Sequence, residues 1–230
     1  MLKHLKSAAR KVIRPVLHKP ELEAAFDLLG TDYGGWPLLR ELTPTGALIY
    51  SFGVGEDISF DLTAIEKYSA SVHAFDPTPR CLQWIQNQSV PESFHFHAMG
   101  VSDTDGDIEF FAPELAEHVS FSASPAKKSD PALAVRAPVR RLTTIISELD
   151  TRAPDVLKMD VEGFEYGVLD DMLNGPIRPA QLLIEFHQYM YGIPADRTRR
   201  AVTNLQQAGY QIFYVSKGGH EYAFVDRNRL

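Results

Sequence analysis

Short apolar runs of strand length alternate with turns and helix-forming stretches through most of this chain, and this alternation constrains the fold more than any other feature. The runs lie at residues 47–52, 71–75, 94–98, 156–160 and 182–187. Strands that alternate with helices form a parallel sheet with helices on both faces. Two further strand patterns, at 210–215 and 221–225, flank Lys217-Gly218-Gly219 and predict a terminal hairpin with one antiparallel strand. The sequence therefore predicts one α/β domain with a doubly wound, mostly parallel sheet.

The composition fits a single globular domain with an ordinary core. The chain has 230 residues, and no run of apolar residues is long enough to span a bilayer. Its one cysteine, Cys81, excludes an intrachain disulfide and is typical of a reducing compartment, so we expect a cytoplasmic protein.

The net charge of -7 is unevenly distributed. Residues 1–19 carry six Lys or Arg and no acid, which leaves 17 basic and 30 acidic side chains, a net charge of -13, in the rest. An acidic body of this kind does not favour nucleic acid as a partner. The basic segment has apolar residues at roughly helical spacing, so we expect a solvated helix there, which also suits weak contact with an anionic membrane surface.

These features divide the chain into a basic, helical extension at residues 1–32 and the α/β domain at residues 33–230. Residues 21–46 are expected to be helical and then loop-like. Residues 112–138 contain four prolines and little periodicity, which predicts a long loop. Loops of that length in a compact domain are usually functional and often act as lids.

A glycine turn follows the first apolar run. Gly53 and Gly55 let the backbone approach a ligand closely, because no Cβ stands in the way. A dinucleotide-binding turn needs a third glycine where this chain has Ile58. A phosphate is disfavoured by Glu56 and Asp57, which we expect to open the following helix. The turn therefore predicts a site for a cation or a hydroxyl-rich ligand.

Acidic residues also follow the next two runs. Asp76 lies roughly 20 residues beyond the glycines, a position from which an acid accepts hydrogen bonds from ribose hydroxyls. The alternative is an aspartate that only caps the next helix. Asp103 is placed to meet the exocyclic amine of an adenine ring or, equally, to form a turn. The glycine turn and Asp76 together favour a nucleoside site.

The stretch Val156–Tyr166 carries the strongest chemical signal, because a buried strand ends there at acidic residues. Ligands of open α/β sheets bind outside the carboxyl ends of the strands. We expect residues 182–187 to form the neighbouring strand, which places Glu185 and His187 close to Asp160 or Glu162. Acids and an imidazole that converge in this way can supply a general base or bind a divalent cation. Taken singly, each residue could equally cap a helix or bond a loop.

Five segments, in this order along the chain, resemble the FkbM-type methyltransferases, which are class I S-adenosylmethionine-dependent enzymes. The segments are Leu48–Gly55, Ala74–Pro79, Gly100–Asp103, Leu157–Glu165 and Leu183–His187. The resemblance covers about residues 33–215, and its most specific block is Lys-x-Asp-x-Glu-Gly-x-Glu at residues 158–165. It implies a seven-stranded sheet with the last strand antiparallel, and methyl transfer to a hydroxyl oxygen.

The resemblance also implies a role for each of these segments. Gly53 and Gly55 would face the methionine part of the cofactor, Asp76 its ribose and Asp103 its adenine. The acceptor side would be lined by Asp160, Glu162, Glu185 and His187, with Asp160 also contacting the cofactor. Many relatives have an acid where this chain has Ser51, and we expect Glu56 and Asp57 to take over its hydrogen bonds to the cofactor.

The mechanism we expect is a direct displacement, in which the protein aligns an acceptor oxygen with the methyl–sulfur axis. His187, oriented by Glu185 or Asp160, is the expected base. A divalent cation held by Asp160, Glu185 and His187 is the alternative way to lower the hydroxyl's pKa.

Three other functions remain open. Ile58 and the two acids beside it disfavour a nicotinamide-dependent dehydrogenase. An N-methyltransferase acting on nucleic acid usually has Asn/Asp-Pro-Pro-aromatic where this chain has Asp160-Val161-Glu162-Gly163. The third is a nucleoside-binding module without catalysis. The sequence specifies neither the acceptor, whether a small molecule or a glycan, nor the oligomeric state.

Overall fold

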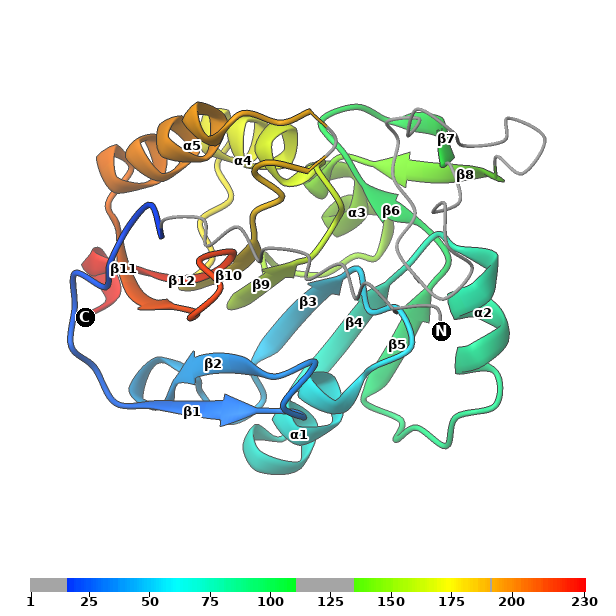
Figure 1. Ribbon diagram of the computed structural model, residues 1–230. Coiled ribbons are helices and arrows are strands. Elements are labelled where there is room, and N and C mark those ends of the chain that lie inside the picture. The colour runs from blue at the N-terminus through cyan, green and yellow to red at the C-terminus, as the bar shows by residue number, and fades with distance from the viewer. Residues whose placement is uncertain (1–15, 111–134, 191) are drawn as a thin grey trace, which may run out of the picture.

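The predicted mixed sheet is the centre of the molecule (Figure 1). The structure is a computed structural model that describes residues 16–110, 135–190 and 192–230. Seven strands lie in the order β11-β12-β10-β9-β3-β4-β5. Their bounds are β3 (Leu48–Phe52), β4 (Ser71–Phe75), β5 (Phe94–His97), β9 (Val156–Met159), β10 (Gln181–Glu185), β11 (Tyr210–Val215) and β12 (Glu221–Asp226). Only β12 runs opposite to the other six strands, so the prediction of one α/β domain with an antiparallel strand in its terminal hairpin is confirmed.

Helices cover both faces of this sheet, as the alternation of strands and helices predicts. They are α1 (Ser59–Tyr68), α2 (Pro79–Ile85), α3 (Leu142–Glu148), α4 (Glu165–Asn174) and α5 (Ala195–Gln207). One face of β9 contributes Leu157 and Met159 to a core shared with α3, α4 and α5. The opposite face packs Val156 against the layer that contains α1. Because side chains alternate along a strand, Lys158 also points toward the α1 face, where it meets Trp36.

The N-terminal part of the described chain differs from the sequence prediction. Residues 21–46 were expected to be helical and then loop-like. Instead β1 (Phe26–Leu29) pairs antiparallel with β2 (Trp36–Leu39), and the short 3-10 helix η1 (Arg40–Leu42) follows. The predicted domain boundary at residue 33 falls in the turn between these two strands.

A buried carboxylate explains why tertiary contacts override the local pattern there. Asp27, on β1, accepts a hydrogen bond of 2.5 Å from the Tyr68 hydroxyl of α1. The same carboxylate pairs with Arg40 at 2.6 Å and with Lys67 at 2.7 Å. These contacts hold the β1–β2 hairpin against α1, and a sequence pattern of apolar residues does not report them.

A second small sheet was only partly predicted. It has the order β6-β8-β7, with β6 (Gly100–Val101), β7 (Gly106–Phe110) and β8 (Val135–Arg140). The sequence also predicts a short strand at residues 107–111, and β7 lies there. The predicted loop at 112–138 lies mostly outside the described residues, and its last four residues belong to β8. The predicted basic helix falls mainly on residues 1–15, also outside that part of the chain.

The start of α1 is also later than predicted. Glu56 and Asp57 precede the helix, which begins at Ser59, rather than opening it. Within the described residues, no helix is both long enough and apolar enough to cross a bilayer.

Gly53 brings the carboxyl ends of β3 and β9 into contact. Its φ is +75°, in the left-handed region that favours glycine. A Cβ at this position would lie 1.7 Å from the backbone oxygen of Asp160. Glycine is therefore required here so that the turn can pack against the end of β9. This requirement is separate from the close approach of a ligand.

Replacement of Gly53 by alanine should destabilise the fold far more than the same change at Gly46. Gly46 has a similar φ of +77° but no atom within 4 Å of its Cβ position. Gly46→Ala should lower the free energy of unfolding by about 1–2 kcal/mol, the cost of the left-handed conformation. Gly53→Ala should lower it by more than about 4 kcal/mol, because the strand ends must also move apart. Urea unfolding of both variants measures this, and equal losses would contradict the packing argument.

Candidate active site

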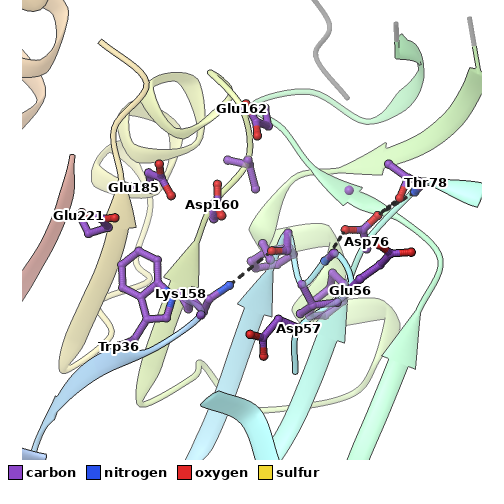
Figure 2. A pocket seen from close by; sticks show the side chains of 18 of the residues that line it. Trp36, Glu56, Asp57, Asp76, Thr78, Lys158, Asp160, Glu162, Glu185 and Glu221 are labelled. Carbon is purple, nitrogen blue, oxygen red and sulfur yellow. Dashed lines mark hydrogen bonds between the residues drawn. The ribbon is translucent and has the colours of Figure 1, made fainter. Parts of the chain in front are cut away.

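A cavity of about 670 Å³ opens at the carboxyl ends of the central strands (Figure 2). The glycine turn after β3 and Asp76 after β4 form one part of its lining. The residues that end β9 and β10 form another part, and the turn of the β1–β2 hairpin closes a third side. The cavity thus lies where ligands bind in open α/β sheets.

Asp76 fixes the shape of the glycine turn. Its carboxylate accepts a hydrogen bond of 3.0 Å from the Gly55 N–H, and bonds of 2.9 Å and 2.5 Å from the N–H and hydroxyl of Thr78. Burial raises the pKa of this carboxyl. Gly53, Gly55 and Asp76, which the sequence predicted to share a nucleoside site, therefore line one part of one cavity.

Glu56 and Asp57 also line the cavity, but both are held by protein donors. Glu56 forms an ion pair of 2.7 Å with Arg80 of α2. Asp57 accepts hydrogen bonds of 2.8 Å from the Thr31 hydroxyl and from the Ser59 N–H. Burial works against ionisation of Asp57, but these hydrogen bonds outweigh it and lower the carboxyl's pKa. The two acids give this end of the cavity fixed negative charge.

Asp103 lies apart from the described lining of the cavity. It is exposed, and its carboxylate accepts a hydrogen bond of 3.2 Å from the Ser102 hydroxyl. The carboxylate faces α4, because a Cβ on Gly167 would lie 2.8 Å from it. Gly100 and Val101 line the cavity in its place. The position of Asp103 in the sequence correctly indicated that its segment lies near the cavity. It did not indicate the direction in which the Asp103 side chain points.

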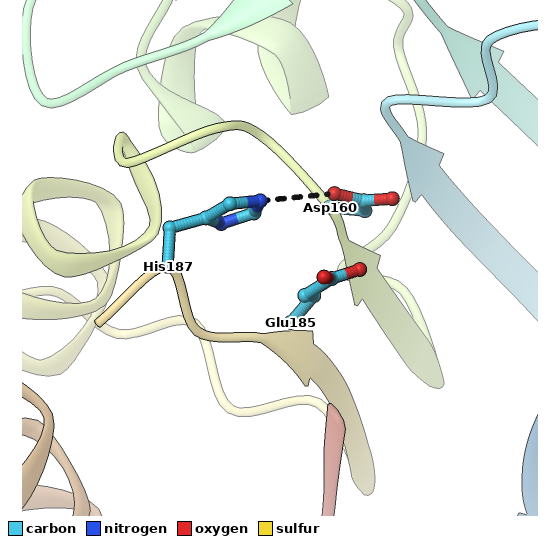
Figure 3. Close-up of side chains that lie close together, drawn as sticks. All are labelled: Asp160, Glu185 and His187. Carbon is cyan, nitrogen blue, oxygen red and sulfur yellow. Dashed lines mark ion pairs between the residues drawn. The ribbon is translucent and has the colours of Figure 1, made fainter. Parts of the chain in front are cut away.

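The expected cluster of acids around His187 is present at the ends of β9 and β10 (Figure 3). His187 Nε2 lies 3.3 Å from a Glu162 oxygen and 3.6 Å from an Asp160 oxygen. Asp160, Glu185 and His187 each offer an atom within 4.8 Å of the others. Glu162 has a positive φ of 51°, and the turn that it forms with Gly163 returns its carboxylate to His187. The proximity inferred from adjacent parallel strands is thus confirmed.

Glu165 completes this cluster, although no role was predicted for it from the sequence. It is fully buried and accepts hydrogen bonds from the backbone N–H groups of His187 and Gly163, at 2.9 and 2.8 Å. It also lies 3.4 Å from His187 Nδ1. The only sequence signal for Glu165 was its position as the last acid of the Lys-x-Asp-x-Glu-Gly-x-Glu block.

Glu221, Tyr33, Trp36 and Lys158 also line the cavity and were not singled out by the sequence. Glu221 lies directly opposite Glu185 across the pairing of β10 and β12. Tyr33 is 91% exposed at the hairpin turn. No spacing rule identifies Glu221, Tyr33 or Trp36, because β12 and the hairpin reach the cavity through tertiary packing. Lys158 opens the Lys-x-Asp-x-Glu-Gly-x-Glu block on β9, but no role was predicted for it.

The carboxylates keep His187 protonated. Burial alone would lower the pKa of its imidazole, but Glu165, Glu162 and Asp160 outweigh this and raise it to about 10. The pKa values of two neighbouring acids are raised as well, which favours their neutral form. Burial raises the pKa of Asp160, and burial together with the charge of Asp160 raises the pKa of Glu185. His187 is therefore an imidazolium at neutral pH, and Glu185 is the carboxylate most inclined to accept a proton.

The same geometry bears on the predicted divalent cation. Asp160, Glu185 and His187 are close enough to share one ion. A metal requires His187 as a neutral imidazole. The surrounding carboxylates stabilise its protonated form instead. The cluster therefore favours a proton on His187 over a bound metal ion.

The His187 imidazole should titrate near pH 10 rather than near its ordinary value of 6.5. Because the pKa is higher in the folded state, this contact stabilises the fold fully below about pH 6.5 and loses that contribution as the pH rises toward 10. NMR titration of the imidazole carbon resonances measures the pKa directly. A midpoint near pH 6.5 would contradict the assigned charge state.

Comparisons with known proteins find methyltransferases. The model of the FkbM methyltransferase domain matches residues 46–212. "Probable methyltransferase-like protein 24" of Rattus norvegicus is 23% identical over 190 residues, which cover 78% of this chain and 46% of the relative. The Homo sapiens protein of the same name is 22% identical over 182 residues, covering 74% of this chain and 42% of that one.

The fold has a counterpart among solved structures. The crystal structure of methyltransferase FkbM from Methylobacillus flagellatus KT aligns with a TM-score of 0.52 at 17% identity, over 82% of this chain and 45% of that one. This chain therefore spans less than half the length of these three relatives. Because the family model matches well over half of its residues, the chain belongs to the FkbM family of S-adenosylmethionine-dependent methyltransferases.

Proposed function

We propose that this protein transfers the methyl group of S-adenosylmethionine to a hydroxyl oxygen of a small molecule or glycan. The observation that carries the proposal is that one cavity holds both the glycine turn with Asp76 and the cluster of Asp160, Glu185 and His187. The bound cofactor supplies an activated methyl group on a sulfonium. The protein's own residues must therefore bind a cationic nucleoside and accept the proton of the alcohol.

The charge of the cavity suits such a cofactor. Eight carboxyl side chains line it, and the basic residues in its described lining are Lys158 and His187. The acids are Asp32, Glu56, Asp57, Asp76, Asp160, Glu162, Glu185 and Glu221. A cleft lined mainly by one sign of charge concentrates ligands of the opposite sign. The sulfonium and amino groups of the cofactor meet that requirement, and we assign its ribose to Asp76.

Glu185 is the base in this proposal. An alcohol must lose its proton as the new C–O bond forms, and a base is most effective when its pKa lies near the working pH. Burial and the charge of Asp160 raise the pKa of Glu185 in that direction. His187, expected from the sequence to be the base, is protonated and instead holds Asp160 and Glu162 in place. The proton of the acceptor hydroxyl therefore passes to the Glu185 carboxylate.

The acceptor and the compartment are part of the same proposal. Carboxylates accept hydrogen bonds from hydroxyl groups, and several line the cavity near Glu185, so a polyol or sugar fits the site chemically. Cys81 is a free, buried thiol, which accords with the cytoplasm.

Glu185→Gln should reduce kcat for methyl transfer about 100- to 10,000-fold, because it removes the base. The dissociation constant of the cofactor should change little. In the wild-type protein, kcat should rise with pH through the raised pKa of Glu185. Mass spectrometry of a sugar and polyol panel detects the methyl ether and S-adenosylhomocysteine. Glu66→Gln, at an exposed position of α1, is the control.

Two outcomes would contradict this proposal. Unchanged turnover by Glu185→Gln would exclude Glu185 as the base. Tight cofactor binding with no methyl transfer to any acceptor would instead support the nucleoside-binding module without catalysis.

A further inference from the structure

Lys158 is a buried cation at the floor of the cavity (Figure 2). It lies on β9, and only 6% of its side chain is exposed. Its ammonium reaches the glycine turn, where Nζ lies 3.4 Å from the Gly53 carbonyl oxygen. The Trp36 ring of β2 lies against it, with its centroid 5.6 Å from Nζ. Lys158 therefore joins three of the elements that form the cavity.

The described surroundings of Lys158 supply acceptors for fewer than its three N–H donors. An ammonium has three N–H donors. Within the described residues, Nζ makes one long hydrogen bond, to Gly53, and no ion pair. A buried charge without a partner costs several kcal/mol, so such groups are normally paired or bind a ligand. The position of Lys158 in the cavity lining therefore points to an anionic ligand group.

The charge of Lys158 acts through space on four aspartates, and none of them forms an ion pair with it among the described residues. They are Asp57, Asp61, Asp76 and Asp160. Asp61 is buried on α1, on the same side of the sheet as Lys158, and Lys158 acts on its carboxyl through space rather than by direct contact. Its Oδ1 has no hydrogen-bond partner among the described residues. The lysine and the aspartate thus remain separate charges, and the Lys158 donors stay available to the cavity.

The cofactor carries only one anionic group, the carboxylate of its amino-acid end. Every acid in the lining would repel this group. His187 is already enclosed by Glu162, Glu165 and Asp160. Lys158 is the other basic residue in the described lining, and it lies at the glycine turn.

We propose that Lys158 binds the carboxylate of the amino-acid end of S-adenosylmethionine. This assignment rests on the cofactor part of the proposed function and not on the identity of the acceptor. Lys158 lies on β9 and Asp160 directly follows that strand, two residues later, so the two side chains face the same side about 6.6 Å apart. A carboxylate held at Lys158 places the sulfonium of the same amino acid beside Asp160. Lys158 thereby sets the position of the methyl group relative to the acid cluster.

A comparison of two ligands that differ only in the carboxylate tests this directly. Calorimetry would measure the binding of S-adenosylmethionine and of its decarboxylated analogue to the wild-type protein and to Lys158→Met. The wild-type protein should bind the decarboxylated analogue about 10- to 100-fold more weakly, because a charge-assisted hydrogen bond is lost. Lys158→Met should lose a similar factor for S-adenosylmethionine and little or none for the analogue.

Two controls separate this result from a general loss of structure. Lys217→Met, at an exposed residue of the turn between β11 and β12, should leave both affinities unchanged. Thermal unfolding without ligand should show that Lys158→Met still folds. Equal weakening of both ligands by Lys158→Met would overturn the proposal and assign Lys158 a structural role, as would equal binding of both ligands to the wild-type protein. If the wild-type protein bound neither ligand, the proposal would fail together with the cofactor assignment.

Discussion

The backbone contact between Gly53 and Asp160 holds the two halves of the site at a fixed separation. The first half is the turn after β3, which Asp76 shapes through the Gly55 N–H. The second is the acid cluster that starts at Asp160. A side chain at Gly53 would force these strand ends apart, because its Cβ would overlap the Asp160 carbonyl. One glycine thus fixes the predicted cofactor-binding residues next to the predicted acceptor-binding residues.

Charge organises the same cavity in a second way. The lining is mainly acidic, and its two described basic residues occupy different environments. His187 is enclosed by carboxylates, which stabilise its charge and position their own oxygen atoms. Lys158 is buried without an ion pair in the described structure. The first cation stabilises the cluster, and the second is the residue that we propose to bind the carboxylate of the cofactor.

The sequence predicted the central sheet and much of the site because both depend on local regularities. Apolar runs located the strands, and adjacent parallel strands necessarily bring Asp160 and Glu185 together. Features that depend on tertiary contacts were missed or misread. The β1–β2 hairpin is held by the buried carboxylate of Asp27. The charge of His187 depends on three carboxylates, and one of them, that of Glu165, was not expected near His187 from the sequence. The direction of Asp103 likewise depends on α4.

The most direct test of the account is a crystal structure with S-adenosylhomocysteine, the demethylated form of the cofactor. The account predicts that the ribose hydroxyls bind Asp76 and that the sulfur faces Asp160 and Glu185, both of which line the cavity. A ligand bound elsewhere, or one whose sulfur points away from these two carboxylates, would contradict it.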